Sequence, residues 1–164
     1  MSLKEFFSND DNKKEWIEKH NKFEIKRYSK IADNFFKQLI HDMNIDRNIV
    51  RFSEDEFCFR LDEKDKYGRF AYYLDFKIDN KVIEFNGDIF HANPEIFESD
   101  ENPNPFITDL TSQEIWDKDE ERLDILKNGK LDVLVIWEKD VVTNIEKELE
   151  KCKIFIKNKE LINA

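Results

Sequence analysis

The spacing of apolar positions changes along the chain, and each change indicates a new secondary-structure element. In residues 29–43, "SKIADNFFKQLIHDM", apolar side chains recur three and four positions apart, the pattern of one face of a helix. Ser29 stands at the N-cap position of this helix. The next apolar runs are shorter and are separated by polar turns, as in strands. They are "EFCFRL", "RFAYYLDFKI" and "KVIEFN", with Asp79 and Asn80 as the predicted turn between the last two.

The second half of the chain predicts a helix, a strand and a final helix. Thr111 and Glu114 in "TSQEIW" have the spacing of a capping box, and the helix that they open should end near Asn128 and Gly129. The nearly unbroken apolar run "LDVLVIWE" is typical of a strand that is buried on both faces. A last helix is predicted over about residues 143–158.

The resulting order, α-β-β-β-α-β-α, favours an α/β or α+β fold with a mixed central β-sheet flanked by helices. A meander of three strands is followed by a helical crossover to the last strand. The length of 164 residues is that of one domain. We place its core at about residues 29–140, between an N-terminal basic segment, residues 1–28, and the C-terminal helix.

The composition indicates in which cellular compartment the protein is expected. Two cysteines are too few for a disulfide framework, and no apolar run is long enough for a signal peptide or a membrane span. Heavy use of Lys, Asn, Ile and Phe suggests A+T-rich coding DNA. We therefore expect a soluble, cytoplasmic protein of a bacterium or a phage-infected host cell, with no membrane partner.

Charge is unevenly distributed along the chain. The net charge of −10 argues against a general nucleic-acid binder. However, residues 13–30 hold seven basic and three acidic side chains, whereas residues 94–121 hold ten acidic side chains and one lysine. A basic segment beside an acidic cluster is compatible with DNA and a metal ion, and equally with ordinary solvated faces.

The predicted hairpin brings two acids together. If Asp79 and Asn80 are the central residues of a tight turn, Asp75 lies directly opposite Glu84. Like charges at opposed positions are destabilising, and a divalent cation between them would remove the conflict. Oxygen-rich sites of this kind suit Mg²⁺ or Mn²⁺. The alternative is a solvated outer face that carries two ordinary acids.

A histidine and a second helix add candidate chemistry. His91 follows the strand in "NGDIFH", and a histidine of near-neutral pKa could activate the water that attacks a phosphodiester, although it could also be structural. On the second helix, Asp119 and Arg122 share the stripe of Ile115 and Leu126. Asp119 and Arg122 either pair with each other, or Asp119 orients His91 and Arg122 meets a phosphate.

Together, "YYLDF", "KVIEFNGDIFH" and "DEERLDILKNGKLDVLVIWEKD" resemble motifs of the PD-(D/E)XK nuclease superfamily. The similar branch is the EDxHD type, shared by very-short-patch mismatch repair endonucleases and phage-associated homing endonucleases. The resemblance covers roughly residues 29–140. It implies a restriction-endonuclease-like core and metal-dependent hydrolysis of DNA phosphodiester bonds, with Mg²⁺ or Mn²⁺ as cofactor.

The resemblance also implies roles for individual residues. Asp75 matches the central metal-binding aspartate, Glu84 the acidic position of the E-x-K strand, and Phe85 a residue whose backbone carbonyl can bind the metal. His91 matches the catalytic histidine, which acts as general base, and Asp119 matches the helix aspartate that supports it.

Two departures from the family pattern keep a second function class open. Asn86 takes the catalytic position where the superfamily usually has lysine, and the glutamate often found on the first helix has only Asp33 or Asn34 near its position. A nuclease-fold module without catalysis, binding DNA or protein, is therefore the alternative. The cysteine and histidine content cannot supply the structural zinc site of the mismatch repair relatives, so a phage-type homing or restriction-like endonuclease is favoured over mismatch repair.

Double-stranded DNA is the expected partner. Basic side chains of the N-terminal region and the second helix are the candidates for phosphate contacts, which position a protein without specifying sequence. They are Lys13, Lys14, Lys26, Arg27, Lys30 and Arg122. Sequence specificity would come from loops, from a homodimer or from further chain.

Overall fold

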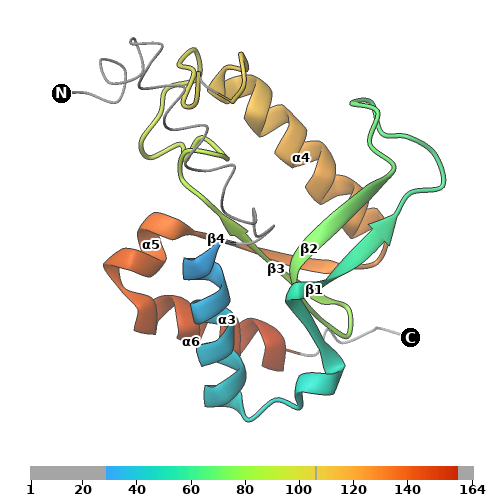
Figure 1. Ribbon diagram of the computed structural model, residues 1–164, viewed down its shortest axis with the longest axis vertical. Helices are drawn as coiled ribbons and strands as arrows, with labels where there is room; N and C mark the ends of the chain where they lie inside the picture. The colour runs from blue at the N-terminus through green and yellow to red at the C-terminus, as the bar shows by residue number, and fades with distance from the viewer. Residues whose placement is uncertain (1–28, 106, 159–164) are drawn as a thin grey trace, which may run out of the picture.

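The computed structural model describes residues 29–105 and 107–158, and its order of elements confirms the predicted fold class (Figure 1). None of the helices in these residues is long and apolar enough to cross a membrane. The predicted last helix, about residues 143–158, corresponds to α6, and the short helix α5 that precedes it was not predicted. The elements are α3 (Lys30–Met43), the 3-10 helix η1 (Arg47–Ile49), β1 (Val50–Arg60), β2 (Ala71–Ile78), β3 (Lys81–Asn86), α4 (Ser112–Asn128), β4 (Asp132–Trp137), α5 (Glu138–Thr143) and α6 (Ile145–Lys157).

Local signals define the ends of both helices that flank the site. The Ser29 hydroxyl accepts a hydrogen bond from the backbone N–H of Ile31 at the start of α3. Thr111 and Glu114 form the predicted capping box at the start of α4, and the helix ends at Asn128. Each cap provides partners for backbone N–H groups that a helix leaves unpaired at its first turn.

The sheet is mixed, with strand order β1-β2-β3-β4. Strands β1, β2 and β3 form an antiparallel meander, and β4 joins parallel to β3 after the crossover through α4. Helices α3 and α6 cover one face, and α4 covers the other (Figure 1). The strand buried along its whole length is β3, not β4, whose only buried residue is Ile136. The prediction for "LDVLVIWE" was wrong on this point, because β4 lies at an edge of the sheet that the described residues form.

The register of the β2–β3 hairpin is the one predicted, but it stops short of the acids. Phe76 pairs with Ile83 and Ile78 with Lys81, and Asp79 turns the chain with φ 49°. The ladder ends at Phe76, so Asp75 and Glu84 are not a ladder pair, and that part of the prediction was wrong.

Strand β1 is irregular at the same position of β2. Phe52 pairs with Phe76 and Phe57 with Leu74, so the four residues 53–56 of β1 lie opposite Asp75 alone. On either side of Asp75, β2 packs on different layers, since Leu74 packs with Leu126 of α4 whereas Phe76 packs with the α3 layer. Beyond Phe76, β2 and β3 are no longer paired, which leaves space for a site at Asp75.

The turn between β1 and β2 is organised around Asp65. Its side chain is fully buried and accepts hydrogen bonds from the backbone N–H groups of Tyr67 and Arg69, from Arg69 Nε and from the Tyr72 hydroxyl. Burial would raise the pKa of Asp65, but the hydrogen bonds from Tyr72 and Arg69 outweigh it and hold this pKa well below its usual value.

We expect Asp65→Asn to lower the free energy of unfolding at neutral pH by about 1–3 kcal/mol, because the charged acceptor of several hydrogen bonds is lost. A carboxylate with a lowered pKa stabilises the fold above its unfolded pKa and loses that effect as the pH falls. The deficit should therefore shrink in acid, as measured by urea unfolding at several pH values. The exposed Asp62 of the same turn provides the control, Asp62→Asn. An equal loss in both variants would contradict the role of Asp65.

Candidate active site

A cavity of about 520 Å³ opens where β2 and β3 diverge. The start of α3, strands β1, β2 and β3, the loop after β3, α4 and the start of α5 all contribute to it. Phe85 and Gly87 form part of its wall. The acidic and basic side chains that line it are Glu56, Asp75, Glu84, His91, Arg122 and Glu138. The structure thus gathers three of the predicted catalytic residues, Asp75, Glu84 and His91, in one place.

Burial makes both central carboxylates weaker acids than usual. Asp75 Oδ2 accepts a hydrogen bond of 2.7 Å from the backbone N–H of Phe85. Burial raises the pKa of Asp75, and this hydrogen bond and the Arg122 charge offset part of the rise. Burial raises the pKa of Glu84 to about 7, against the lowering effect of Arg122. The pair therefore strongly favours a positive charge nearby.

Arg122 is the positive charge that the protein itself provides. Its Nη2 donates to Glu84 Oε2 at 2.7 Å and to the Tyr73 carbonyl at 2.6 Å. It does not pair with Asp119, one of the two alternatives that the helix pattern left open. The ion pair is incomplete, because Arg122 Nε and Glu84 Oε1 are both buried without a hydrogen-bond partner. A fully matched pair would engage two nitrogens and both oxygens.

His91 and Asp119 form the second half of the site. His91 Nδ1 lies 2.7 Å from Asp119 Oδ2. The loop after β3 is held against α4 by the Trp116 indole, which donates to the Ala92 carbonyl at 2.6 Å. Burial alone would lower the pKa of His91, but the hydrogen bond and charge of Asp119 outweigh it and raise this pKa. Asp119 occupies Nδ1, so Nε2 is the ring nitrogen left for a water or a substrate.

Several predicted residues lie elsewhere. Asn86 ends β3 opposite Trp137 and does not line the cavity. Lys30 is exposed at the start of α3, beside the cavity-lining Ser29. The remaining predicted DNA contacts, Lys13, Lys14, Lys26 and Arg27, lie outside the described residues.

Two acids of the cavity were not predicted. Glu56 reaches it from the irregular segment of β1, and Glu138 from the first residue of α5. The segment of Glu56 is held by Ser53, which has φ 56° and donates to Asp33 Oδ1 at 2.7 Å. Serine carries no sequence signal for a positive φ, so the irregularity could not be read from the pattern. Asp33 thus contacts the β1 segment and is not itself among the cavity-lining residues.

The donor set suits a cation that needs few protein ligands. Within residues 29–105 and 107–158, no group of three or more acidic, histidine or cysteine side chains is arranged to hold a metal ion. Mg²⁺, however, is commonly bound through one or two carboxylates while it keeps several waters. Asp75, Glu84 and the Phe85 carbonyl are oxygen donors of that kind, and the unpartnered Glu84 Oε1 is an acceptor that such an ion would satisfy. The residues therefore fit Mg²⁺ or Mn²⁺.

Comparison with known protein families, curated proteins and solved structures finds no match. The likeness to the PD-(D/E)XK nucleases therefore stays a prediction, and the site is interpreted from its own geometry.

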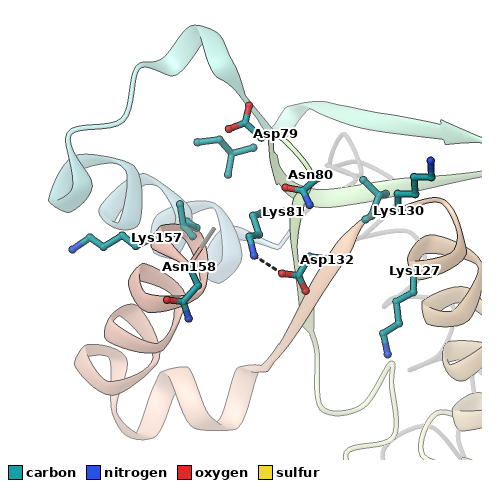
Figure 2. Close-up of a pocket in the computed structure, with 11 residues that line it drawn as sticks. Asp79, Asn80, Lys81, Lys127, Lys130, Asp132, Lys157 and Asn158 are labelled. Atoms are coloured by element: carbon teal, nitrogen blue, oxygen red, sulfur yellow. Dashed lines mark hydrogen bonds and ion pairs between the residues drawn. The ribbon is translucent and has the colours of Figure 1, made fainter. Parts of the chain in front are cut away.

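A larger cavity, about 1150 Å³, lies at the opposite end of the β2–β3 hairpin (Figure 2). At its centre Lys81 pairs with Asp132. Figure 2 shows Lys127, Lys130 and Lys157 pointing away from that pair in different directions. Cations that diverge do not form a pocket for one anion, so this cavity is a weaker candidate site.

The raised pKa of Glu84 predicts a pH dependence of stability. A group whose pKa is raised on folding stabilises the fold below its unfolded pKa and loses that effect as the pH rises through the folded pKa. Between the usual value of 4.5 and about 7, we expect Glu84 to lower the free energy of unfolding by roughly 3 kcal/mol. Urea unfolding in EDTA should show this decline in the native protein and a smaller one in Glu84→Gln. Parallel pH profiles would contradict the assigned shift.

Proposed function

We propose that this protein is a metal-dependent DNA endonuclease, of the homing or restriction-like type, that hydrolyses phosphodiester bonds of double-stranded DNA. The observation that carries the proposal is the meeting of a His91–Asp119 pair with two carboxylates, the partly buried Asp75 and the buried Glu84, at one cavity. Such a combination of a base, an orienting acid and metal-binding oxygens suits attack by water on a phosphodiester.

Each side chain has a distinct task in this reaction. His91 Nε2 accepts the proton of the attacking water, since Nδ1 is engaged by Asp119. Asp119 fixes the ring orientation and stabilises the imidazolium that forms. Asp75, Glu84 and the Phe85 carbonyl would hold Mg²⁺ or Mn²⁺, which polarises the phosphate and stabilises developing negative charge. Because the base must be neutral, the rate should rise with pH through the raised pKa of His91.

A module with this fold but without catalysis is the second candidate. It is favoured by the ion pair between Arg122 and Glu84, which already gives one carboxylate a counter-charge, and by the absence of a three-ligand group among the described side chains. Such a module would bind DNA or protein and would not need a metal.

Cleavage of supercoiled plasmid DNA separates the two candidates. The native protein should nick or cut in Mg²⁺ or Mn²⁺ and be inactive in EDTA, and Asp75→Asn should abolish cleavage. Asp79→Asn is the matched control, since Asp79 is an exposed acid of the same hairpin in a turn conformation that asparagine also adopts. Absence of cleavage in either metal, or equal cleavage by Asp75→Asn and the native protein, would reject the proposed active site.

A further inference from the structure

A second, smaller cavity adjoins the proposed catalytic pair. Its volume is about 200 Å³, and both Phe90 and His91 line it as well as the catalytic cavity. Asp119 also forms part of its wall. A DNA strand that presents a phosphate to His91 therefore has a hollow directly beside it for the adjoining part of its backbone.

Two cations stand at this smaller cavity. Arg69 comes from the β1–β2 turn, and Lys118 directly precedes Asp119 on α4. Both contact the ring of Tyr67, with Lys118 Nζ 5.1 Å and the Arg69 guanidinium carbon 5.3 Å from its centre. The same ring is contacted by Lys66 at 5.0 Å, so it gathers positive charges from distant parts of the sequence at one place.

These cations retain capacity to bind an anion. Lys118 forms no ion pair within the described residues, whereas the neighbouring Lys66 pairs with Glu121. Arg69 binds Asp65 through Nε, and its Nη2 is buried in this structure without a hydrogen-bond partner. The nearby acids Asp65, Asp119 and Glu121 each have a basic partner already.

Lys118 lies in a strongly acidic part of the sequence. Residues 94–121 contain ten acidic side chains, and Lys118 is the single basic one. An acidic segment repels a polyanion unless a cation lies where the polyanion approaches.

The smaller cavity also has apolar walls from Ile107, Leu110 and Ile115, which suit the carbon face of a sugar. The lysines of the larger cavity, in contrast, diverge (Figure 2).

We propose that this smaller cavity binds a sugar–phosphate unit of the DNA backbone next to the scissile phosphate, with Lys118 and Arg69 as its phosphate contacts. The proposal rests on the proposed function, because it takes DNA as the substrate. The contacts position the strand against His91 and carry no sequence information.

Salt dependence of DNA binding tests the contact directly. A labelled duplex of about 20 base pairs is titrated with protein in EDTA at several salt concentrations, so that binding is measured without cleavage. Loss of one phosphate contact should weaken binding and make the slope of log affinity against log salt smaller by about one. We expect this for Lys118→Gln, and we expect Lys118→Arg to retain the native slope. The control is Lys127→Gln, which removes the same charge from the same helix at the larger cavity.

Four outcomes are decisive. A reduced slope for Lys118→Gln alone supports the phosphate site, even if no variant cleaves plasmid, in which case only the proposed catalysis fails. Equal slopes for Lys118→Gln and Lys127→Gln overturn the phosphate site, even if the native protein cleaves DNA. A reduced slope that Lys118→Arg does not restore also overturns it, because a charge contact should survive that exchange. No binding by the native protein at any salt concentration overturns the phosphate site, and cleavage of plasmid in Mg²⁺ or Mn²⁺ then decides the proposed function by itself.

Discussion

His91→Ala is expected to lower the rate of plasmid cleavage by about 10²–10⁴-fold, the usual contribution of a positioned general base. The side chain is about one third exposed and its hydrogen bond is with Asp119, so its removal should leave the fold intact. Single-turnover cleavage at saturating protein measures the chemical step, and circular dichroism checks the fold. A variant that folds normally and cleaves within a few-fold of the native rate would show that another group accepts the proton.

Asp119→Asn gives a sharper test of the same pair, because it changes the pH profile as well as the rate. Asp119 raises the pKa of His91, whereas burial lowers it. Without the carboxylate charge, the pKa of His91 should fall, and the acid limb of the pH–rate profile should move to lower pH. Asp117→Asn, on an exposed position of the same helix, should leave the limb in place. An unmoved limb in Asp119→Asn would mean that Asp119 does not act through His91.

Features set by adjacent residues could be predicted from the sequence. The Ser29 cap, the Thr111 capping box and the hairpin register each depend on a few neighbouring positions, and each is present. Asp75 and Glu84 stood out because acids interrupt apolar strands there, and His91 because it follows the second of these strands; the structure gathers all three at one cavity.

What escaped prediction depends on contacts between distant segments. Four residues of β1 lie opposite Asp75 because Ser53 turns with a positive φ and hydrogen-bonds to Asp33 of α3, and nothing in the sequence near Ser53 signals that conformation. The irregular segment carries Glu56, which lines the cavity, and it lies opposite Asp75, beyond the end of the β2–β3 ladder. The partner of Arg122 could likewise not be predicted from the helix, because the pattern of the helix allows an acid on the same helix and an acid on the sheet equally well.

Arg122→Met is expected to lower the free energy of unfolding by about 3–5 kcal/mol at slightly alkaline pH, because it leaves buried carboxylates without their counter-charge. Methionine keeps much of the apolar volume of the side chain, so the effect reports mainly on charge. The pKa of Glu84 should rise further in this variant, so the deficit should shrink in acid as the carboxyl becomes neutral. Lys139→Met, which breaks the exposed pair with Glu95, should change stability little.

Added Mn²⁺ turns this variant into a test of the metal site. In the native protein a cation must compete with Arg122 for Glu84, whereas in Arg122→Met the carboxylates face no such competitor. Binding to the folded state alone stabilises it by about 2.7 kcal/mol when the ligand is at 100 times its dissociation constant. We therefore expect Mn²⁺ to raise the stability of Arg122→Met more than that of the native protein, and to do so only while Asp75 is present. Equal stabilisation of both proteins, or stabilisation that survives Asp75→Asn, would place the ion away from these carboxylates and leave Arg122 as a purely structural partner of Glu84.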